Sequence, residues 1–282
     1  MSTYRGGRHE HGQNFLTDHT TIDRLARLVT DSPDPIIEIG PGRGRLTQEL
    51  LKHGRSLTAV EIDGHLADRL ASTSAFRDQE HVRIVNADFL DWPLPSHPHV
   101  VVGNVPFHLT TAILRKLLHD ENWTQVVLLV QWEVARRRAG VGGSSMMTVQ
   151  WWPWIDFGMH GRVPRTAFQP APSVDGGLLT MTRRPQPLLS LDAKKAYRQF
   201  VHDVFTGRGR GIAEILTNVV GSLGRNGVQQ LLRDEGVSPS SLPKDLLAEH
   251  WARLFVGTSP RTSVKTGKNS RPTHSTRGRR GR

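Results

Sequence analysis

Apolar residues in the first half of the chain follow two alternating spacings. Short apolar runs rich in Val and Ile, typical of buried strands, occur at 35–40, 56–63, 81–88, 99–104 and 124–131. Between them, apolar residues three or four positions apart predict helices at 17–29, 44–54, 64–73 and 109–119. Strands that alternate with helices form right-handed β-α-β units. The pattern therefore predicts an α/β fold whose parallel sheet is covered on both faces.

The pattern changes after the last of these strands. Residues 136–145, "RRRAGVGGSS", are polar and rich in glycine, which predicts a mobile loop. Residues 154–163 and 174–184 are expected to be two later strands that pair as a hairpin. Pro185 and Pro187 then mark a boundary.

Beyond Pro187 the pattern is helical. In the segment 190–205, one apolar stripe is formed by Tyr197, Phe200, Val201, Val204 and Phe205. Further helices are expected at 226–236 and 242–255. The predicted organisation is an α/β domain at 1–186, a small helical domain at 187–258 and a tail at 259–282.

Charge is concentrated in the tail. Residues 259–282 hold eight Lys and Arg and no acid, out of a net charge of +11, so residues 1–258 carry about +3. A segment with so few apolar residues cannot bury enough surface to order itself, and we expect it to be disordered. Its charge favours an arm that binds nucleic acid, and a tail that only improves solubility is the alternative.

Several function classes are disfavoured. No apolar run approaches the 18 or so residues of a membrane span, and the N-terminal residues lack the apolar core of a signal peptide. The chain has no cysteine, which excludes disulfides and thiolate metal sites and fits a cytoplasmic protein. The pairs His9/His11 and His97/His99 lack the spacing or carboxylate partners of a metal site, so no metal is expected.

The segment "IIEIGPGRGRLT" combines a strand, a glycine-rich turn and the start of a helix. Its glycines allow the backbone to approach a ligand closely, beside the free N–H groups of the helix. Gly40, Gly42 and Gly44 give G-x-G-x-G, and Arg45 breaks the G-x-G-x-x-G of a dinucleotide site. The pattern E-x-G-x-G-x-G instead resembles the S-adenosylmethionine turn of class I methyltransferases, which cradles the amino-acid part of the cofactor.

Two acids follow at the ends of the next two strands. Glu61 lies 21 residues after Gly40, where its carboxylate could accept both ribose hydroxyls of a cofactor. A dinucleotide site would use the same acid, so Glu61 does not discriminate. Asp88 could accept a hydrogen bond from the adenine amino group of the cofactor. The alternative for each acid is a solvated residue at a strand end.

The stretch "VVGNVPFHLTT" ends the fourth strand in a polar turn. Ligands of such sheets bind at the carboxyl ends of the strands, so Asn104 is expected to face the cofactor. Its amide oxygen and a neighbouring backbone carbonyl could accept both hydrogens of an adenine N6 amine and restore the reactivity of its nitrogen. With Val105 in the turn, Pro106 stiffens it and Phe107 offers a face for a stacked base. Methyl transfer would then depend on positioning and electrostatics.

These motifs, in this order, resemble those of the Erm and KsgA rRNA adenine N6-methyltransferases. The resemblance runs from Gln13 to Phe255 and includes "GQNFLTD", "FQPAPSVDGG" and "HWARLF". It implies a class I S-adenosylmethionine-dependent methyltransferase, Rossmann-like, with a small C-terminal helical domain that binds RNA. It implies that Phe168 helps to hold the target adenine. The cofactor contacts that we expect are Asn14, Leu16, Gly40, Gly42, Glu61, Ile62, Asp88, Phe89 and Asn104.

"NVPFHLTTAIL" and the basic tail are more similar to the Erm branch, since KsgA relatives usually read "NLPYNI". The Erm branch implies that a monomer methylates one adenine of 23S rRNA, which blocks macrolide, lincosamide and streptogramin B binding. The KsgA branch implies dimethylation of two adjacent adenines of 16S rRNA. Val105, Phe107 and the tail depart from common Erm patterns and leave open whether one methyl or two are added.

RNA binding is also expected because a target base must be unstacked and moved into the pocket. Candidate phosphate contacts are the tail and Arg136, Arg137, Arg138, Arg162, Arg165, Arg183, Arg184, Arg208 and Arg210. The alternatives are an NAD-dependent oxidoreductase, a non-catalytic RNA-binding protein on the same fold and a DNA adenine methyltransferase.

Overall fold

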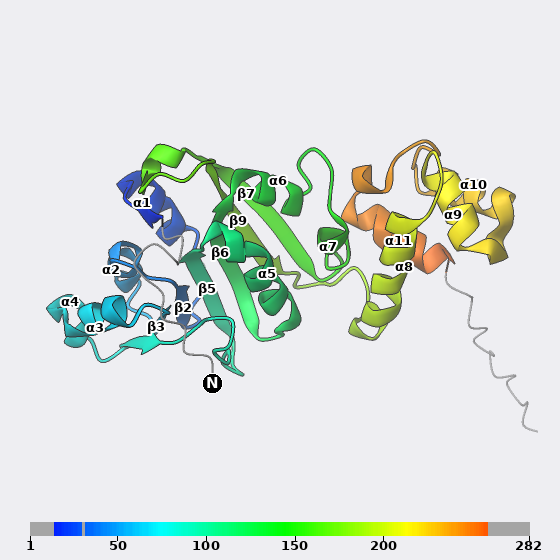
Figure 1. The fold of residues 1–282 in the computed structure, drawn as a ribbon. Coiled ribbons are helices and arrows are strands. Elements are labelled where there is room, and N and C mark those ends of the chain that lie inside the picture. Colours follow the sequence, from blue (N-terminus) through cyan, green and yellow to red (C-terminus); the bar gives the residue numbers. More distant parts are fainter. Residues whose placement is uncertain (1–13, 30–31, 259–282) are drawn as a thin grey trace, which may run out of the picture.

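A seven-stranded sheet forms the centre of the protein. The structure is a computed structural model that describes residues 14–29 and 32–258. The strands lie in the order β4-β3-β2-β5-β6-β9-β7 (Figure 1). Their bounds are β2 Ile36–Ile39, β3 Leu57–Glu61, β4 Val82–Asn86, β5 His99–Asn104, β6 Trp123–Gln131, β7 Ile155–Val163 and β9 Gly176–Arg183. The first five in this order are parallel to their neighbours, and β9 pairs antiparallel with β6 and β7. The α/β fold and the pairing of the two later strands are confirmed.

Helices cover both faces of this sheet. They are α1 His19–Arg27, α2 Arg45–Leu51, α3 Gly64–Ser72, α4 Ser74–Arg77, α5 Thr110–His119, α6 Trp132–Arg138 and α7 Met146–Val149. Alternate residues of β5 point to opposite faces, as the geometry of a strand requires. Val100 and Val102 belong to one core cluster with residues of α1 and α2, and Val101 belongs to another with residues of α5 and α6.

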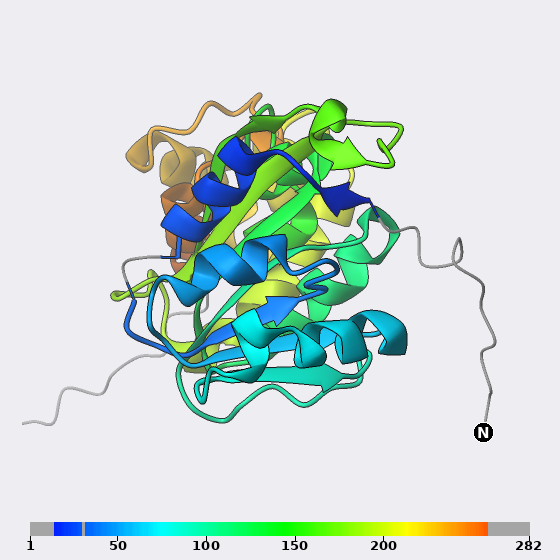
Figure 2. The same ribbon diagram turned by 90° about the vertical axis from the view of Figure 1, so that its left-hand side faces the viewer.

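A two-stranded sheet joins the start of the described chain to a distant segment. β1 (Phe15–Leu16) pairs antiparallel with β8 (Phe168–Gln169), so that Leu16 lies opposite Phe168. The Thr17 N–H also donates to the Ala167 carbonyl over 2.8 Å. Figure 2 shows the dark-blue β1 beside the light-green segment that contains β8. Residues 15–16 of the "GQNFLTD" motif and residues 168–169 of the "FQPAP" motif are therefore neighbours in space.

The C-terminal part is helical. Its helices are α8 Lys194–Thr206, α9 Ile212–Val219, α10 Gly224–Asp234 and α11 Ala248–Thr258. The predicted stripe of α8 is confirmed, since four of its residues are buried and Phe205 packs partly buried against the same cluster; the four are Tyr197, Phe200, Val201 and Val204. α9 was not predicted, and α11 begins later than predicted. The segment before α11 forms only a 3-10 turn at Pro243–Asp245. The backbone of Leu246 is extended, so this turn does not continue into α11.

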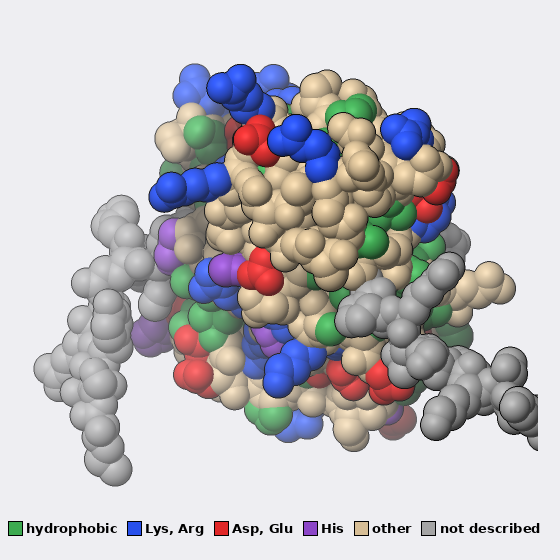
Figure 3. Space-filling model, turned by 90° about the vertical axis from the view of Figure 1, so that its right-hand side faces the viewer, with side chains coloured by type: hydrophobic (Ala, Val, Ile, Leu, Met, Phe, Trp, Pro, Cys, Tyr) green, Lys and Arg blue, Asp and Glu red, His purple; other side chains and the backbone are tan. Residues whose placement is uncertain are grey.

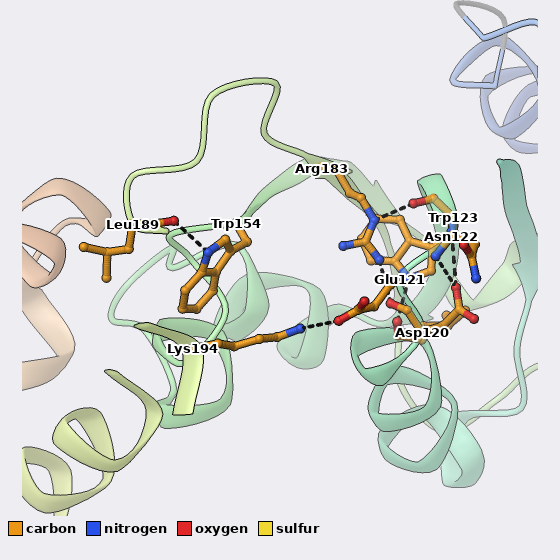
Figure 4. Close-up of polar contacts among 9 residues, drawn as sticks. Asp120, Glu121, Asn122, Trp123, Trp154, Arg183, Leu189 and Lys194 are labelled. Atoms are coloured by element: carbon orange, nitrogen blue, oxygen red, sulfur yellow. Dashed lines mark hydrogen bonds and ion pairs between the residues drawn. The ribbon is translucent and has the colours of Figure 1, made fainter. Parts of the chain in front are cut away.

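Polar contacts anchor the linker between the sheet and these helices. The Trp154 indole N–H donates to the Leu189 carbonyl over 2.9 Å, and Lys194 pairs with Glu121 over 3.2 Å (Figure 4). Arg183, at the end of β9, donates to the carbonyls of Asp120 and Trp123 (Figure 4). The domain limits at 186 and 258 stay predictions, and the tail lies outside the described residues.

The glycine-rich break is shorter than predicted. Arg136, Arg137 and Arg138 belong to α6, so the prediction of a loop at 136–145 is wrong for its first part. Ala135 is buried against β9 and holds this helix on the sheet, so the helix continues through the three arginines. The glycine-rich turn begins only near Gly140, whose φ is positive. The rest of the segment contacts the C-terminal part, where the Ser144 N–H donates to the Lys244 carbonyl over 2.8 Å.

Candidate active site

A pocket lies at the carboxyl ends of β2, β3 and β5, where the sequence places its candidate residues. All nine predicted cofactor contacts line it: Asn14, Leu16, Gly40, Gly42, Glu61, Ile62, Asp88, Phe89 and Asn104. Val105, Pro106 and Phe107 line it as well. The parallel strands bring these residues together because their ends share one edge of the sheet.

The glycine-rich turn forms one wall. Gly42 has a φ of 58°, in the left-handed region that favours glycine, and an added Cβ would lie 3.0 Å from the Phe15 ring. Its N–H donates to Glu61 Oε2 over 2.9 Å. The turn is thus tied to the end of the next strand, and Gly42 itself adds no side chain to this wall.

Glu61 forms the adjoining wall and is only 2% exposed. Its two oxygens accept hydrogen bonds from the backbone N–H groups of Gly42 and Asp63 over 2.9 and 3.0 Å. Burial raises the pKa of this carboxyl, and these two N–H groups oppose the shift. Each carboxylate oxygen can accept a further hydrogen bond, so the pair suits a vicinal diol.

Asp88 starts a turn on the next strand along. Its Oδ1 accepts from the Leu90 N–H over 2.8 Å, which fixes the carboxylate at the pocket wall between Ala87 and Phe89. A carboxylate held in this way beside an aromatic ring is suited to the amino edge of a purine.

The orientation of the Asn104 amide is set by the N-terminal segment. Its Nδ2 donates to the Asn14 carbonyl over 2.8 Å, which leaves Oδ1 as the acceptor in the pocket. The Val105 N–H donates to the Leu129 carbonyl over 3.3 Å, and Pro106 precedes a 3-10 turn that begins at Phe107. The polar turn is therefore held from both sides.

Phe168 does not line the pocket with the other predicted residues. It is 4% exposed and packs edge-to-face on Phe107, with 6.2 Å between ring centroids and 75° between ring planes. The structure places it behind Phe107, where it supports that ring. A direct contact between Phe168 and an adenine stays a prediction.

Glu38, the acid of the E-x-G-x-G-x-G pattern, was not predicted as a site residue. It lines the pocket at 1% exposure, and its Oε2 has no hydrogen-bond partner among the described residues. Burial raises its pKa to about 8, and the nearby Glu61 carboxylate adds to the shift. The only signal for this role was the position of the acid at the end of a buried strand, before the glycines.

Glu38→Gln is expected to stabilise the protein at pH 8. The pKa of Glu38 rises from 4.5 to about 8 on folding, so the folded protein retains a proton that the unfolded chain has lost. The free energy of unfolding therefore falls as the pH rises through this window. The gain should be on the order of a few kcal/mol at pH 8 and absent near pH 4, as measured by urea unfolding. The exposed Glu80→Gln is the control, and equal gains at both pH values would contradict the prediction.

Four of the candidate phosphate contacts differ in how accessible they are. The side chains of Arg183 and Arg184 already have partners within the protein, since Arg183 donates to backbone carbonyls and Arg184 pairs with Asp156. Arg208 and Arg210 are exposed on the helical part. Figure 3 shows that Lys and Arg on the face of this part are separated by uncharged surface. This face is therefore not one continuous basic patch.

The described residues offer neither a metal site nor a membrane-spanning helix. Within residues 14–29 and 32–258, no three His, Asp or Glu side chains are grouped as metal ligands would be. His97 and His99 interact through the His97 carbonyl, and His9 and His11 lie outside the described residues. None of the helices in the described part is both long and apolar enough to span a membrane.

The sheet order and the pocket at its carboxyl edge define a class I S-adenosylmethionine-dependent methyltransferase. The chain belongs to the ribosomal RNA adenine dimethylase family, whose model matches residues 5–257. The family and the fold predicted from the motifs are thereby confirmed.

Individual proteins support this assignment. The rRNA adenine N-6-methyltransferase of Corynebacterium diphtheriae is 56% identical over 216 residues, 77% of this chain and 84% of the relative. The mycinamicin-resistance protein MyrB of Micromonospora griseorubida is 45% identical over 261 residues, 90% of this chain and 82% of the relative. The crystal structure of the 23S rRNA methyltransferase ErmE is similar with a TM-score of 0.80 and 35% identity, covering 87% of this chain and 99% of that one.

The pocket fits S-adenosylmethionine. It offers a carboxylate for a diol at Glu61, a carboxylate for a purine amine at Asp88 and the backbone of Gly42 in its wall. The unpaired Glu38 oxygen provides a buried acceptor for an ammonium group.

Proposed function

We propose that this enzyme methylates N6 of one adenine in 23S rRNA and so confers resistance to macrolides, lincosamides and streptogramin B. The observation that carries the chemistry is the Asn104 amide, which lines the pocket and whose Nδ2 donates to the Asn14 carbonyl, so that Oδ1 stays available as an acceptor. The choice of 23S rRNA is supported by the similarity to ErmE and MyrB over most of the chain.

In this proposal, different pocket residues bind different chemical groups of the cofactor. Glu61 binds the ribose hydroxyls, Asp88 binds the adenine amine, and Glu38 accepts from the ammonium group. Gly40 and Gly42 allow the amino-acid part to approach the backbone. The apolar contacts and remaining walls are Leu16, Ile62, Phe89 and Asn14. Bound there, S-adenosylmethionine supplies an electrophilic methyl group.

The chain's own residues then prepare the amine. Asn104 Oδ1 and a carbonyl of the 104–106 turn accept the two N6 hydrogens, which draws the nitrogen lone pair out of the adenine ring. Pro106 keeps the turn rigid, so the acceptors are placed before the substrate binds. After transfer the N6 proton is acidic and leaves to solvent, so no strong general base is required. Most of the rate enhancement comes from positioning.

Phe107→Ala is expected to raise KM for RNA about tenfold or more, because base–aromatic stacking contributes roughly 1–3 kcal/mol per base. Phe107→Tyr keeps the ring and should retain most activity. Initial rates over a range of RNA concentrations would measure both variants. A Phe107→Ala enzyme with normal KM and kcat would contradict the stacking role.

The first test is transfer from labelled S-adenosylmethionine to naked 23S and naked 16S rRNA, with the labelled base mapped. One labelled 23S adenine would support the proposal, and the digest would also separate mono- from dimethyladenine. Label on adjacent 16S adenines would favour the KsgA-like alternative. RNA binding without label would favour a non-catalytic protein and refute the role given to Asn104.

The basic tail is proposed as an arm that contacts RNA phosphates. If about four of its charges do so, deleting residues 259–282 should reduce the slope of log K against log salt by roughly 3. A filter-binding titration at several salt concentrations measures this slope. An unchanged slope would mean that the tail only improves solubility.

A cytoplasmic, monomeric enzyme with an RNA-binding helical domain is part of the same proposal, and size-exclusion chromatography tests the monomer.

A further inference from the structure

Trp132 differs from every other tryptophan of the chain. All seven lie within the described residues, and six belong to the larger core cluster or pack against it. Trp132 belongs to neither core cluster and is half-buried. An aromatic ring that is not needed for the core and remains partly accessible is available for a ligand.

The position of Trp132 relates it to the active site. It follows β6 directly, three residues after Leu129, and Leu129 is the register partner of Asn104. It therefore lies at the same carboxyl edge of the sheet, one strand from the catalytic turn. It is also the first residue of α6, which carries Arg136 and Arg137 away from this edge.

The Trp132 ring is covered by an exposed arginine. The Arg162 guanidinium lies 5.7 Å from the ring centroid, and its side chain is 61% exposed. Asp175 holds both residues, since its Oδ2 pairs with Arg162 Nε over 2.6 Å and its carbonyl accepts from the Trp132 N–H over 2.9 Å. Gly177 leaves room for the indole, because an added Cβ would lie 3.1 Å from it.

A chain of contacts links this stack to the pocket. Phe107, in the pocket wall, packs on Phe168. The Phe168 ring in turn lies 3.4 Å from where a Cβ of Gly176 would be, and Gly176 lies between Asp175 and Gly177. The stack is thus linked to the pocket wall through Phe168 and the segment 175–177.

We propose that Arg162 and Trp132 form a stacking platform for a nucleotide next to the target adenine; this rests on the proposed rRNA substrate. When the target adenine swings into the pocket, a neighbouring base loses its stacking partner. A guanidinium plane backed by an indole replaces that partner, as arginine and aromatic planes do in RNA recognition. Arg162 and Trp132 are therefore positioning residues, and Arg162 acts through its plane as well as its charge.

The test is a double-mutant cycle between protein and RNA. Methyl transfer is measured on an RNA fragment that contains the mapped adenine, and on versions with an abasic nucleotide at each flanking position. Trp132→Ala should raise KM for intact RNA about tenfold, with kcat and the affinity for S-adenosylmethionine nearly unchanged. At one flanking position, replacing the base by an abasic nucleotide should raise the wild-type KM for RNA by a similar factor. The same replacement should raise the KM of Trp132→Ala little further, because the stacking partner is already missing.

Conservative variants separate stacking from charge and from folding. Trp132→Phe keeps an aromatic plane and should retain most of the affinity. Arg162→Lys keeps the charge but not the plane, so it should resemble Trp132→Ala. Arg77→Lys is the matched control, because Arg77 is 62% exposed and also pairs with an aspartate, at the far end of the sheet. Melting temperatures identify any variant that is simply destabilised.

The outcomes are distinct. Additive losses at every flanking position, or full activity of Arg162→Lys, would overturn the platform while leaving the proposed function intact. A wild-type enzyme that methylates neither 23S nor 16S rRNA would overturn the proposed function, and the platform with it.

Discussion

Asn104→Ala is expected to reduce kcat for methyl transfer by about a hundred- to a thousandfold, the range found when one electrostatic contact to a transition state is removed. The variant loses the Oδ1 acceptor of a residue that lines the pocket and keeps the hydrogen bond between Gly42 and Glu61. Binding of S-adenosylmethionine should change little, because the other proposed contacts stay in place. Single-turnover rates and calorimetric cofactor titrations measure the two effects separately.

A matched control exists in the helical part. Asn218 also donates its Nδ2 to a backbone carbonyl, that of Arg208, over 2.9 Å, and it is not part of the pocket lining. Asn218→Ala therefore removes a comparable hydrogen bond and should leave turnover unchanged. If Asn104→Ala kept near-normal turnover with the cofactor bound, the amide would have no part in activating the amine.

Much of this site could be predicted from local sequence. Each strand is a short apolar run, and Gly40, Glu61 and Asn104 each stand directly after or at the end of one. Because parallel strands present their carboxyl ends at one edge, residues far apart in the chain could be expected to meet there. The glycine spacing then favoured one cofactor class over another.

Other features depend on contacts that leave no local signal. The pairing of Leu16 with Phe168 joins segments some 150 residues apart and is visible only in the folded chain. The burial of Glu38, and hence its raised pKa, follows from the layers packed around β2. Trp132 and Arg162 meet because Asp175, on a third segment, binds both.

Phe168 illustrates the difference between a motif and its geometry. Its "FQPAP" context implies a role beside the target adenine, and the structure places the ring behind Phe107 with 4% exposure. An aromatic residue in a proline-rich loop gives no indication of how deeply the ring is buried. Support of Phe107 by an edge-to-face contact is the role that the structure provides.

Glu61→Gln is expected to weaken binding of S-adenosylmethionine about ten- to a hundredfold, since an unsatisfied buried hydrogen-bonding group costs roughly 1–3 kcal/mol. An amide has one acceptor oxygen, so it cannot accept from both Gly42 and Asp63 while also binding a diol. One backbone N–H therefore loses its partner, and its turn moves. At saturating cofactor, kcat should fall far less, because Asn104 and Phe107 are untouched.

The measurement is the dissociation constant of S-adenosylmethionine by calorimetry, together with KM for RNA and kcat at saturating cofactor. Glu133→Gln is the control, because this acid forms an exposed ion pair with Arg136 and is not part of the pocket lining. An unchanged dissociation constant in Glu61→Gln would remove the ribose contact from the proposal. A fall in kcat equal to that of Asn104→Ala would instead mean that Glu61 holds the catalytic turn, because cofactor binding and transfer would then depend on the same carboxylate.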